Sequence, residues 1–356
     1  MLTAGIGRAA MTNASALVRD LVNYREQSGS RALFELAVTA GGLFLSWALM
    51  VVSLRVGYWL TLPLAIPTAG FLVRLFMIQH DCGHGSFFRQ RLLNDWIGRA
   101  IGVLTLTPYD CWKRNHAIHH AASGNLDRRG VGDILTLTVR EYLSKSPLRR
   151  LAYRVYRTPI VMFGLGPAYL FLLQHRLPFE QMRVGWRPWI SAMATNAAIA
   201  LLAGASIWLV GTLPFLAVHL PVVLLAASIG VWLFYIQHQF EFVVWFRGEG
   251  WKPADAALLG SSHYDLPGVL RWFTANIGVH HVHHLNSRIP SYRLRQVLRD
   301  HPSFRNIGRI TISQSLRSSC LSLWDETQQR LVAFSEAERS GRSNRFAADH
   351  GDGKPA

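Results

Sequence analysis

Histidine is concentrated in three short windows of the chain. Nine of the 15 histidines lie in His80-Asp-Cys-Gly-His84, His116-Ala-Ile-His119-His120 and His280-His281-Val-His283-His284. A random arrangement would place roughly 0.6 histidines in those fifteen positions, so composition does not explain the windows. Imidazole is the commonest metal ligand in proteins. The windows therefore predict a metal site.

The spacing within each window suits a helix. Side chains four residues apart share a helix face, so His80 and His84 can converge on one point. The H-x-x-H-H pattern occurs twice and puts three imidazoles on one stripe each time. These are His116, His119 and His120 in the second window, and His280, His283 and His284 in the third.

Two further histidines lie close to these sets. His281 is rotated by about 100° from His280, which favours a supporting or structural role over a ligand role. His238 ends an apolar stretch and could be either one more ligand or a polar residue at a helix end. We expect no site role for His175, His219, His263, His301 and His350, which have no histidine neighbours in the sequence.

Eight or nine imidazoles are more than one metal ion needs, because an octahedral centre takes only six ligands. Two ions are therefore predicted. Ligand type alone admits Zn, Cu, Fe or Ni. Neutral imidazoles leave the metal charge uncompensated, so nearby carboxylates should accept hydrogen bonds from the other ring N–H groups. The candidates for this supporting role are Asp81, Asp110, Asp133 and Glu241. Each of them could equally be a solvated acid in a loop.

The composition indicates that the histidine windows belong to a membrane protein. Half of the chain is hydrophobic and only 16% is charged, against about a quarter charged in soluble domains. The uncharged stretches are near the roughly 20-residue length of a membrane span. They predict four spans in two helical hairpins, at about residues 36–54, 56–78, 188–210 and 214–237.

A shorter apolar segment, at about residues 159–173, is broken by glycine and proline, and we expect it to be interfacial or re-entrant. Arginines flank it on both sides, which places both flanks in the cytoplasm. The loops assigned outside hold only Arg55. The membrane topology thus accounts for the net charge of +16, and no nucleic-acid partner is needed to explain it.

The predicted fold class is therefore an all-α integral membrane protein whose four transmembrane helices carry a cytoplasmic cap with the histidine windows. Residues 1–335 form one membrane domain, and residues 336–356 form a polar, disordered tail. We expect both termini and the site to face the cytoplasm.

At these residues the chain resembles the membrane fatty acid desaturases, most closely the bacterial and cyanobacterial acyl-lipid type. The resemblance spans roughly residues 60–300. It rests on HDCGHGSFF (80–88), TPYDCWKRNHAIHH (107–120), GDILTLTVREY (132–142), QHQFE (237–241) and HHVHHLNSRIPSYRL (280–294).

The resemblance implies a non-haem di-iron centre, O2 as co-substrate and a cis double bond introduced into a lipid-bound acyl chain. It implies ligand roles for eight of the nine histidines in the three windows, all except His281, and for His238. No cytochrome b5-like H-P-G-G segment occurs in the sequence. The two electrons should therefore come from a separate ferredoxin-like or cytochrome b5-like protein, attracted to an arginine-rich face if that donor is acidic.

Two rival functions stay open at this point. Carotenoid or hydrocarbon hydroxylases and ketolases share part of the histidine pattern. A metal transporter could also line its path with histidines, although its ligands would then lie near the bilayer midplane.

Overall fold

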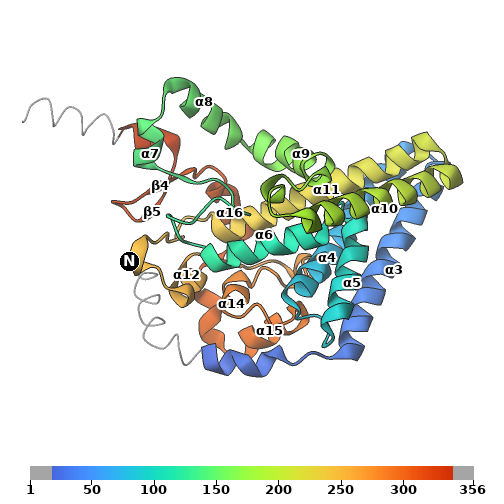
Figure 1. Cartoon of the computed structure of the whole chain (residues 1–356), viewed down its shortest axis with the longest axis horizontal. Helices are drawn as coiled ribbons and strands as arrows, with labels where there is room; N and C mark the ends of the chain where they lie inside the picture. Colours follow the sequence, from blue (N-terminus) through green and yellow to red (C-terminus); the bar gives the residue numbers. More distant parts are fainter. Residues whose placement is uncertain (1–17, 340–356) are drawn as a thin grey trace, which may run out of the picture.

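The computed structural model describes residues 18–339 and is dominated by two long helical hairpins (Figure 1). The first hairpin is α3 (Gly29–Ser53) with α4 (Tyr58–His84), and the second is α10 (Trp186–Val210) with α11 (Thr212–His238). All four helices are long and apolar enough to cross a membrane. The prediction of an all-α membrane protein with four spans in two hairpins is confirmed.

The first two helices extend beyond the predicted spans at their charged ends. The predicted first span begins at residue 36 because Glu35 is charged. Helix α3 nevertheless begins at Gly29 and includes Glu35, whose carboxylate forms ion pairs with Arg31 and Arg74. At the other end, α4 continues through His80 and His84, which the sequence placed beyond the span. It ends only at Gly85, whose φ of 65° favours glycine.

The second hairpin turns tightly and exposes apolar surface. Gly211 alone separates α10 from α11, with a φ of 88° that suits glycine. Large apolar side chains project outward from α10, and Trp208 is 84% exposed. Outward apolar surface of this kind is stable against lipid rather than water.

The segment between the hairpins carries the second histidine window. Helix α6 (Tyr109–Ala122) holds that window and follows α5 (Arg91–Leu104), which packs against α4. The chain then forms β1 (Leu137–Thr138), α7 (Val139–Ser144), α8 (Pro147–Tyr156), the π-helical turn η2 (Val161–Leu165), α9 (Gly166–Leu172), and the short 3-10 turns η3 (Gln174–Arg176) and η4 (Phe179–Gln181).

The short apolar segment predicted at 159–173 is broken in the structure. Helix α8 and the helical stretch Val161–Arg176 meet at 59°, so they make a fifth span only if the bent pair counts as one. Helix α9 and turn η2 lie against α11 (Figure 1). This placement makes them a wall beside the second hairpin.

The chain after α11 forms the cap, which lies at the end of the hairpins away from the Gly211 turn (Figure 1). Its helices are α12 (Pro253–Leu259), α13 (Gly268–Phe273), α14 (His280–Leu285), α15 (Ser291–Asp300) and α16 (Ile312–Ser318). Its strands are β2 (His263–Tyr264), β3 (Arg309–Ile310), β4 (Leu323–Asp325) and β5 (Arg330–Val332). They pair in the orders β1-β4-β5 and β2-β3.

Further 3-10 turns are η1 (Leu21–Arg25), η5 (Gly248–Gly250) and η6 (Pro302–Asn306). The ordered cap extends past residue 336, where the predicted tail begins. Residues 334–339 are helical and Ala337 is buried. Glu338 forms an ion pair with Arg154 that ties this end to α8. The rest of the predicted tail lies outside the described residues.

Candidate metal centre

The structure brings nine histidines from four helices into two adjacent groups. Site A comprises five histidines from α4, α6 and α14, and site B comprises four from α6, α11 and α14. In each site, one ring nitrogen per residue lies within 4.8 Å of all the others. The members are His80, His84, His116, His120 and His283 in site A, and His119, His238, His280 and His284 in site B.

The facing nitrogens suit metal ligation better than mutual hydrogen bonding. In site A, Nε2 of His116 lies 3.0 Å from Nε2 of His84 and 3.1 Å from Nε2 of His120. A neutral imidazole nitrogen holds either one proton or one lone pair, so it cannot satisfy two such neighbours. Ligand nitrogens at metal bonds of about 2.1 Å lie about 3.0–3.4 Å apart, which fits lone pairs directed at one cation.

Site B repeats this arrangement. Nε2 of His280 lies 3.0 Å from Nε2 of His238 and 3.0 Å from Nε2 of His284. His238 belongs to this group and lies beside His119, with their Nε2 atoms 3.1 Å apart, so it could hold a metal ion together with the other three histidines.

Hydrogen-bond acceptors behind the rings fix the protonated nitrogen. Asp133 accepts from Nδ1 of His119, and the carbonyl oxygen of Gly260 lies 3.2 Å from Nδ1 of His238. Oδ1 of Asp81 lies 3.4 Å from Nδ1 of His80. With Nδ1 protonated, each ring presents the lone pair of Nε2 to its site.

The other three supporting candidates lie elsewhere. Asp110 accepts two hydrogen bonds of 3.0 Å from Arg99, because it sits in the first turn of α6 and faces α5. Glu241 is exposed beyond the end of α11. His281 is fully buried and bonds the Phe304 carbonyl through Nε2 at 3.0 Å, which is a structural contact.

Burial keeps the imidazoles outside the spanning helices neutral. It lowers the pKa of His116, His120, His283 and His284 well below the ordinary value, and neighbouring imidazoles lower it further. Burial would raise the pKa of Asp133, but its hydrogen bond from His119 holds that pKa below the usual value. Neutral rings backed by a carboxylate are suited to a cation.

Three of the five histidines without a predicted role are described by the structure and lie apart from both sites. His219 stacks on Phe215, His263 bonds the Arg305 carbonyl at 2.7 Å, and His301 packs on Tyr24. His175 is different, because it lines a cavity that reaches the histidine groups. His350 lies outside the described residues.

That cavity has a volume of about 760 Å³ and lies between the hairpins and the α8–α9 wall. His80, His116 and His280 form part of its lining, so both sites border it. Most of the remaining lining is apolar and comes from α4, α9 and α11. Its size is within the range of about 300–1,000 Å³ typical of ligand sites.

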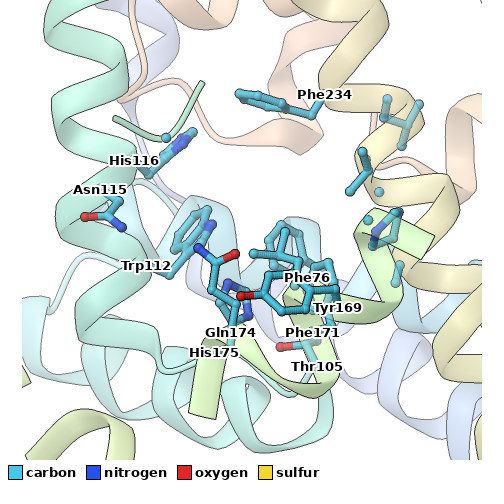
Figure 2. Close-up of a pocket in the computed structure, with 18 of the residues that line it drawn as sticks. Phe76, Thr105, Trp112, Asn115, His116, Tyr169, Phe171, Gln174, His175 and Phe234 are labelled. Atoms are coloured by element: carbon cyan, nitrogen blue, oxygen red, sulfur yellow. The ribbon is translucent and has the colours of Figure 1, made fainter. Parts of the chain in front are cut away.

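Aromatic rings form the cavity wall next to the histidines (Figure 2). Trp112 stacks on His116 with ring centroids 4.7 Å apart, and Phe76 meets Trp112 edge-on at 5.4 Å. Phe171 continues the wall at 6.4 Å from Phe76. Phe234 lines the cavity from α11 and contacts the His119 ring at 5.1 Å.

Some polar residues of the cavity have no signal in the sequence. Gln174, His175 and Thr105 are among them (Figure 2). Gln174 and His175 lie on the short turn η3 and follow no ligand spacing, so the sequence does not predict that they line a cavity. The only sequence feature at this position is the end of the apolar segment at residue 173.

Comparison with known proteins agrees with this geometry. Residues 56–311 match the family model described as fatty acid desaturase. The chain is 44% identical to a fatty acid desaturase of Bacillus subtilis over 318 residues, covering 89% of this chain and 90% of that protein. It is 30% identical to a Synechocystis sn-1 acyl-lipid omega-3 desaturase (ferredoxin), with 62% of each chain covered. An Anabaena variabilis sn-1 oleoyl-lipid 12-desaturase is 28% identical, over 68% of this chain and 69% of its own.

Proposed function

Because the chain belongs to the fatty acid desaturase family, a group of oxidoreductases, we propose that it introduces a cis double bond into the acyl chain of a membrane lipid, using O2. The observation that carries this proposal is the large apolar cavity that ends on His80, His116 and His280. An apolar cavity against a metal-ligating wall suits a long hydrocarbon substrate.

Sites A and B would hold two iron ions, with the nine histidines as ligands and with Asp133 and Asp81 supporting them. Imidazole ligands also accept other metals, so iron is inferred from the family. A mid-chain methylene has no acidic proton and no leaving group, so side-chain acid–base chemistry cannot attack it. The bound iron supplies the oxidative chemistry that such a C–H bond requires.

The reaction balances as follows. Two adjacent C–H bonds of the acyl chain break and a C=C bond forms. O2 accepts two electrons and two protons from the acyl chain, two electrons from an external donor and two protons from solvent, and leaves as two molecules of water.

The residues of this chain position the substrate. Trp112, Phe76 and Phe171 form a continuous wall that holds the hydrocarbon against the histidine sites. Holding one C–C bond beside the metals selects the position of the double bond. The apolar lining also keeps water from the reacting carbons.

The lipid substrate and the donor are supported by the relatives. Two relatives are acyl-lipid desaturases, and the name of one specifies ferredoxin. We propose a ferredoxin-like or cytochrome b5-like donor here. The arginine excess on the loops between the hairpins supports a cytoplasmic location for the cap, both termini and the donor, and we propose a bacterial inner membrane.

The rival functions are less well supported. The family match does not favour a carotenoid or hydrocarbon hydroxylase or ketolase. A metal transporter would need a path through the spans, whereas the histidines of α4 and α11 lie in their final turns, toward the cap.

Expression in a bacterial host that lacks desaturases tests the proposal directly. Gas chromatography with mass spectrometry of the host fatty acids should reveal new double bonds, and derivatisation should locate them. The purified protein should contain about two iron ions per chain. The matched control carries His119→Ala and His283→Ala, which removes one ligand from each site.

The control should yield saturated chains only. Double bonds formed equally by the control would refute the role of sites A and B. Hydroxylated or ketone products from the unmodified chain would favour the hydroxylase or ketolase instead.

A further inference from the structure

A second hollow lies beside the acyl cavity, at the beginning of α10. It has a volume of about 310 Å³, and its lining includes Arg114 and Arg187. The two hollows share Cys111 and Gln181 as wall residues. A single molecule could therefore place one part in each hollow.

The two arginines have uncompensated charge. Both are exposed, and neither makes a hydrogen bond or an ion pair with any residue from 18 to 339 that the structure records. The one carboxylate in the lining, Asp110, is bonded through both oxygens to Arg99. The hollow thus presents two free guanidinium groups, which match the oxygens of a phosphate.

The hollow lies at the start of a candidate membrane span, where lipid headgroups are expected. The apolar span of α10 begins at Trp186, which is 68% exposed and lines the hollow. Exposed tryptophans at span ends mark the membrane–water interface. On α6, Arg114 precedes His116 by two residues, about 3 Å of helix rise, so the hollow and the histidine sites border neighbouring parts of the same helix.

From these observations we propose that Arg114 and Arg187 bind the phosphate of a glycerophospholipid whose acyl chain occupies the main cavity. This inference rests on the proposed function and names its substrate class. Gln181, which bonds the Cys111 carbonyl at 2.8 Å, separates the two hollows, and the glycerol region of the lipid would lie over it.

A selectivity measurement tests the proposal. The full-length protein is reconstituted with its electron donor in nanodiscs that contain two lipids with the same acyl chains. One lipid is phosphatidylglycerol, and the other is an uncharged monogalactosyldiacylglycerol. The wild type should desaturate the phospholipid in preference, and the R114Q/R187Q variant should reduce the ratio of the two products about tenfold or more.

The matched control is R183Q. Arg183 is exposed on the same segment, makes no recorded contact with the described residues, and lies outside the hollow. R183Q should keep the wild-type ratio. An unchanged ratio in R114Q/R187Q, or an equal reduction in R183Q, would overturn the proposal.

A binding measurement separates this inference from the proposed function. Phosphatidylglycerol should raise the melting temperature of the detergent-solubilised wild type more than the galactolipid does, and R114Q/R187Q should lose that difference. This readout needs no catalysis, so it can succeed even if no double bond forms.

Inorganic phosphate at millimolar concentration distinguishes a lipid phosphate from a free one. It should neither reproduce the thermal shift nor change the product ratio, because the acyl chain bound in the main cavity keeps the lipid phosphate at a high local concentration beside the hollow. A thermal shift from inorganic phosphate equal to that from phosphatidylglycerol would assign the hollow to free phosphate and refute the lipid proposal.

Discussion

The imidazole rings of His120 and His284 are stacked, with centroids 4.1 Å apart and planes 10° apart, although the two residues belong to different sites. This contact places site A directly against site B. Ions held by the two groups would share one buried cluster, where they would supply the chemistry of a single reaction.

Loss of either stacked histidine should therefore impair the whole centre. We expect His120→Ala and His284→Ala each to lower activity beyond the about 10–100-fold typical of losing a supporting group. Bound iron per chain, measured by elemental analysis, should fall in both variants. His301→Gln, remote from both sites, should retain the wild-type iron content. Retention of full iron by His284→Ala would argue against site B.

The Asp133 carboxylate should tune site B through His119. Asp133→Asn keeps the shape but weakens the acceptor for the His119 N–H group, so we expect metal affinity to fall about 10–100-fold. Titration of the stripped protein with Fe²⁺ measures this. Asp110→Asn is the comparison, because Asp110 bonds Arg99 instead, and it should leave metal affinity unchanged. An equal loss in both variants would contradict the assignment.

Filling the cavity should alter the position of the double bond. Gly230 lines the cavity on α11, and a Cβ added there meets no atom within 4 Å. Gly230→Phe should shorten the space for the acyl chain and change the product distribution. Gly204→Phe on α10 also has open space around it but lies outside the cavity. A wild-type product pattern from Gly230→Phe, by mass spectrometry, would show that the substrate binds elsewhere.

The buried ion pair between Glu35 and Arg74 should stabilise the first hairpin. Arg74 also lies 4.2 Å from the Trp272 ring centroid, and its Nε donates to Thr39 at 3.1 Å. Glu35→Gln would leave the guanidinium buried and unpaired, which should cost about 3–5 kcal/mol. Thermal unfolding in detergent measures the loss.

Two comparisons make that experiment decisive. The double variant with Glu35→Leu and Arg74→Met should recover most of the stability, because no charge stays buried. Glu26 has an exposed carboxylate that forms an ion pair of 3.7 Å with Arg293. Glu26→Gln removes this pair and should change the free energy of unfolding by less than about 1 kcal/mol. A double variant no more stable than Glu35→Gln would contradict the explanation.

Removal of metal should destabilise the cap. An ion present at a hundred times its Kd stabilises the folded state by about 2.7 kcal/mol. A chelator should therefore lower Tm, and added Fe²⁺ should restore it. The same chelator should have little effect on the variant with His119→Ala and His283→Ala. If both proteins responded equally, the chelator would be acting at another place.

The sequence alone determined the local features of this protein. The i, i+3 and i+4 spacings predicted that His116, His119 and His120 share one helix, because that helix fixes their relative directions. Uncharged stretches likewise predicted four spans. The start of α3 was missed because one of the two ion pairs that compensate Glu35 comes from Arg74 on another helix.

The division of the histidines into groups was decided by tertiary structure alone. Neighbours such as His119 and His120 point to different sites, since successive helix residues diverge by about 100° and their partners come from α11 and α14. Tertiary structure also decided which carboxylates support the histidines. Asp133 contacts His119, whereas Asp110 bonds Arg99, although nothing in the sequence favoured one of them over the other. Which groups meet across space depends on the paths of the connecting loops, and residue spacing carries no information about those paths.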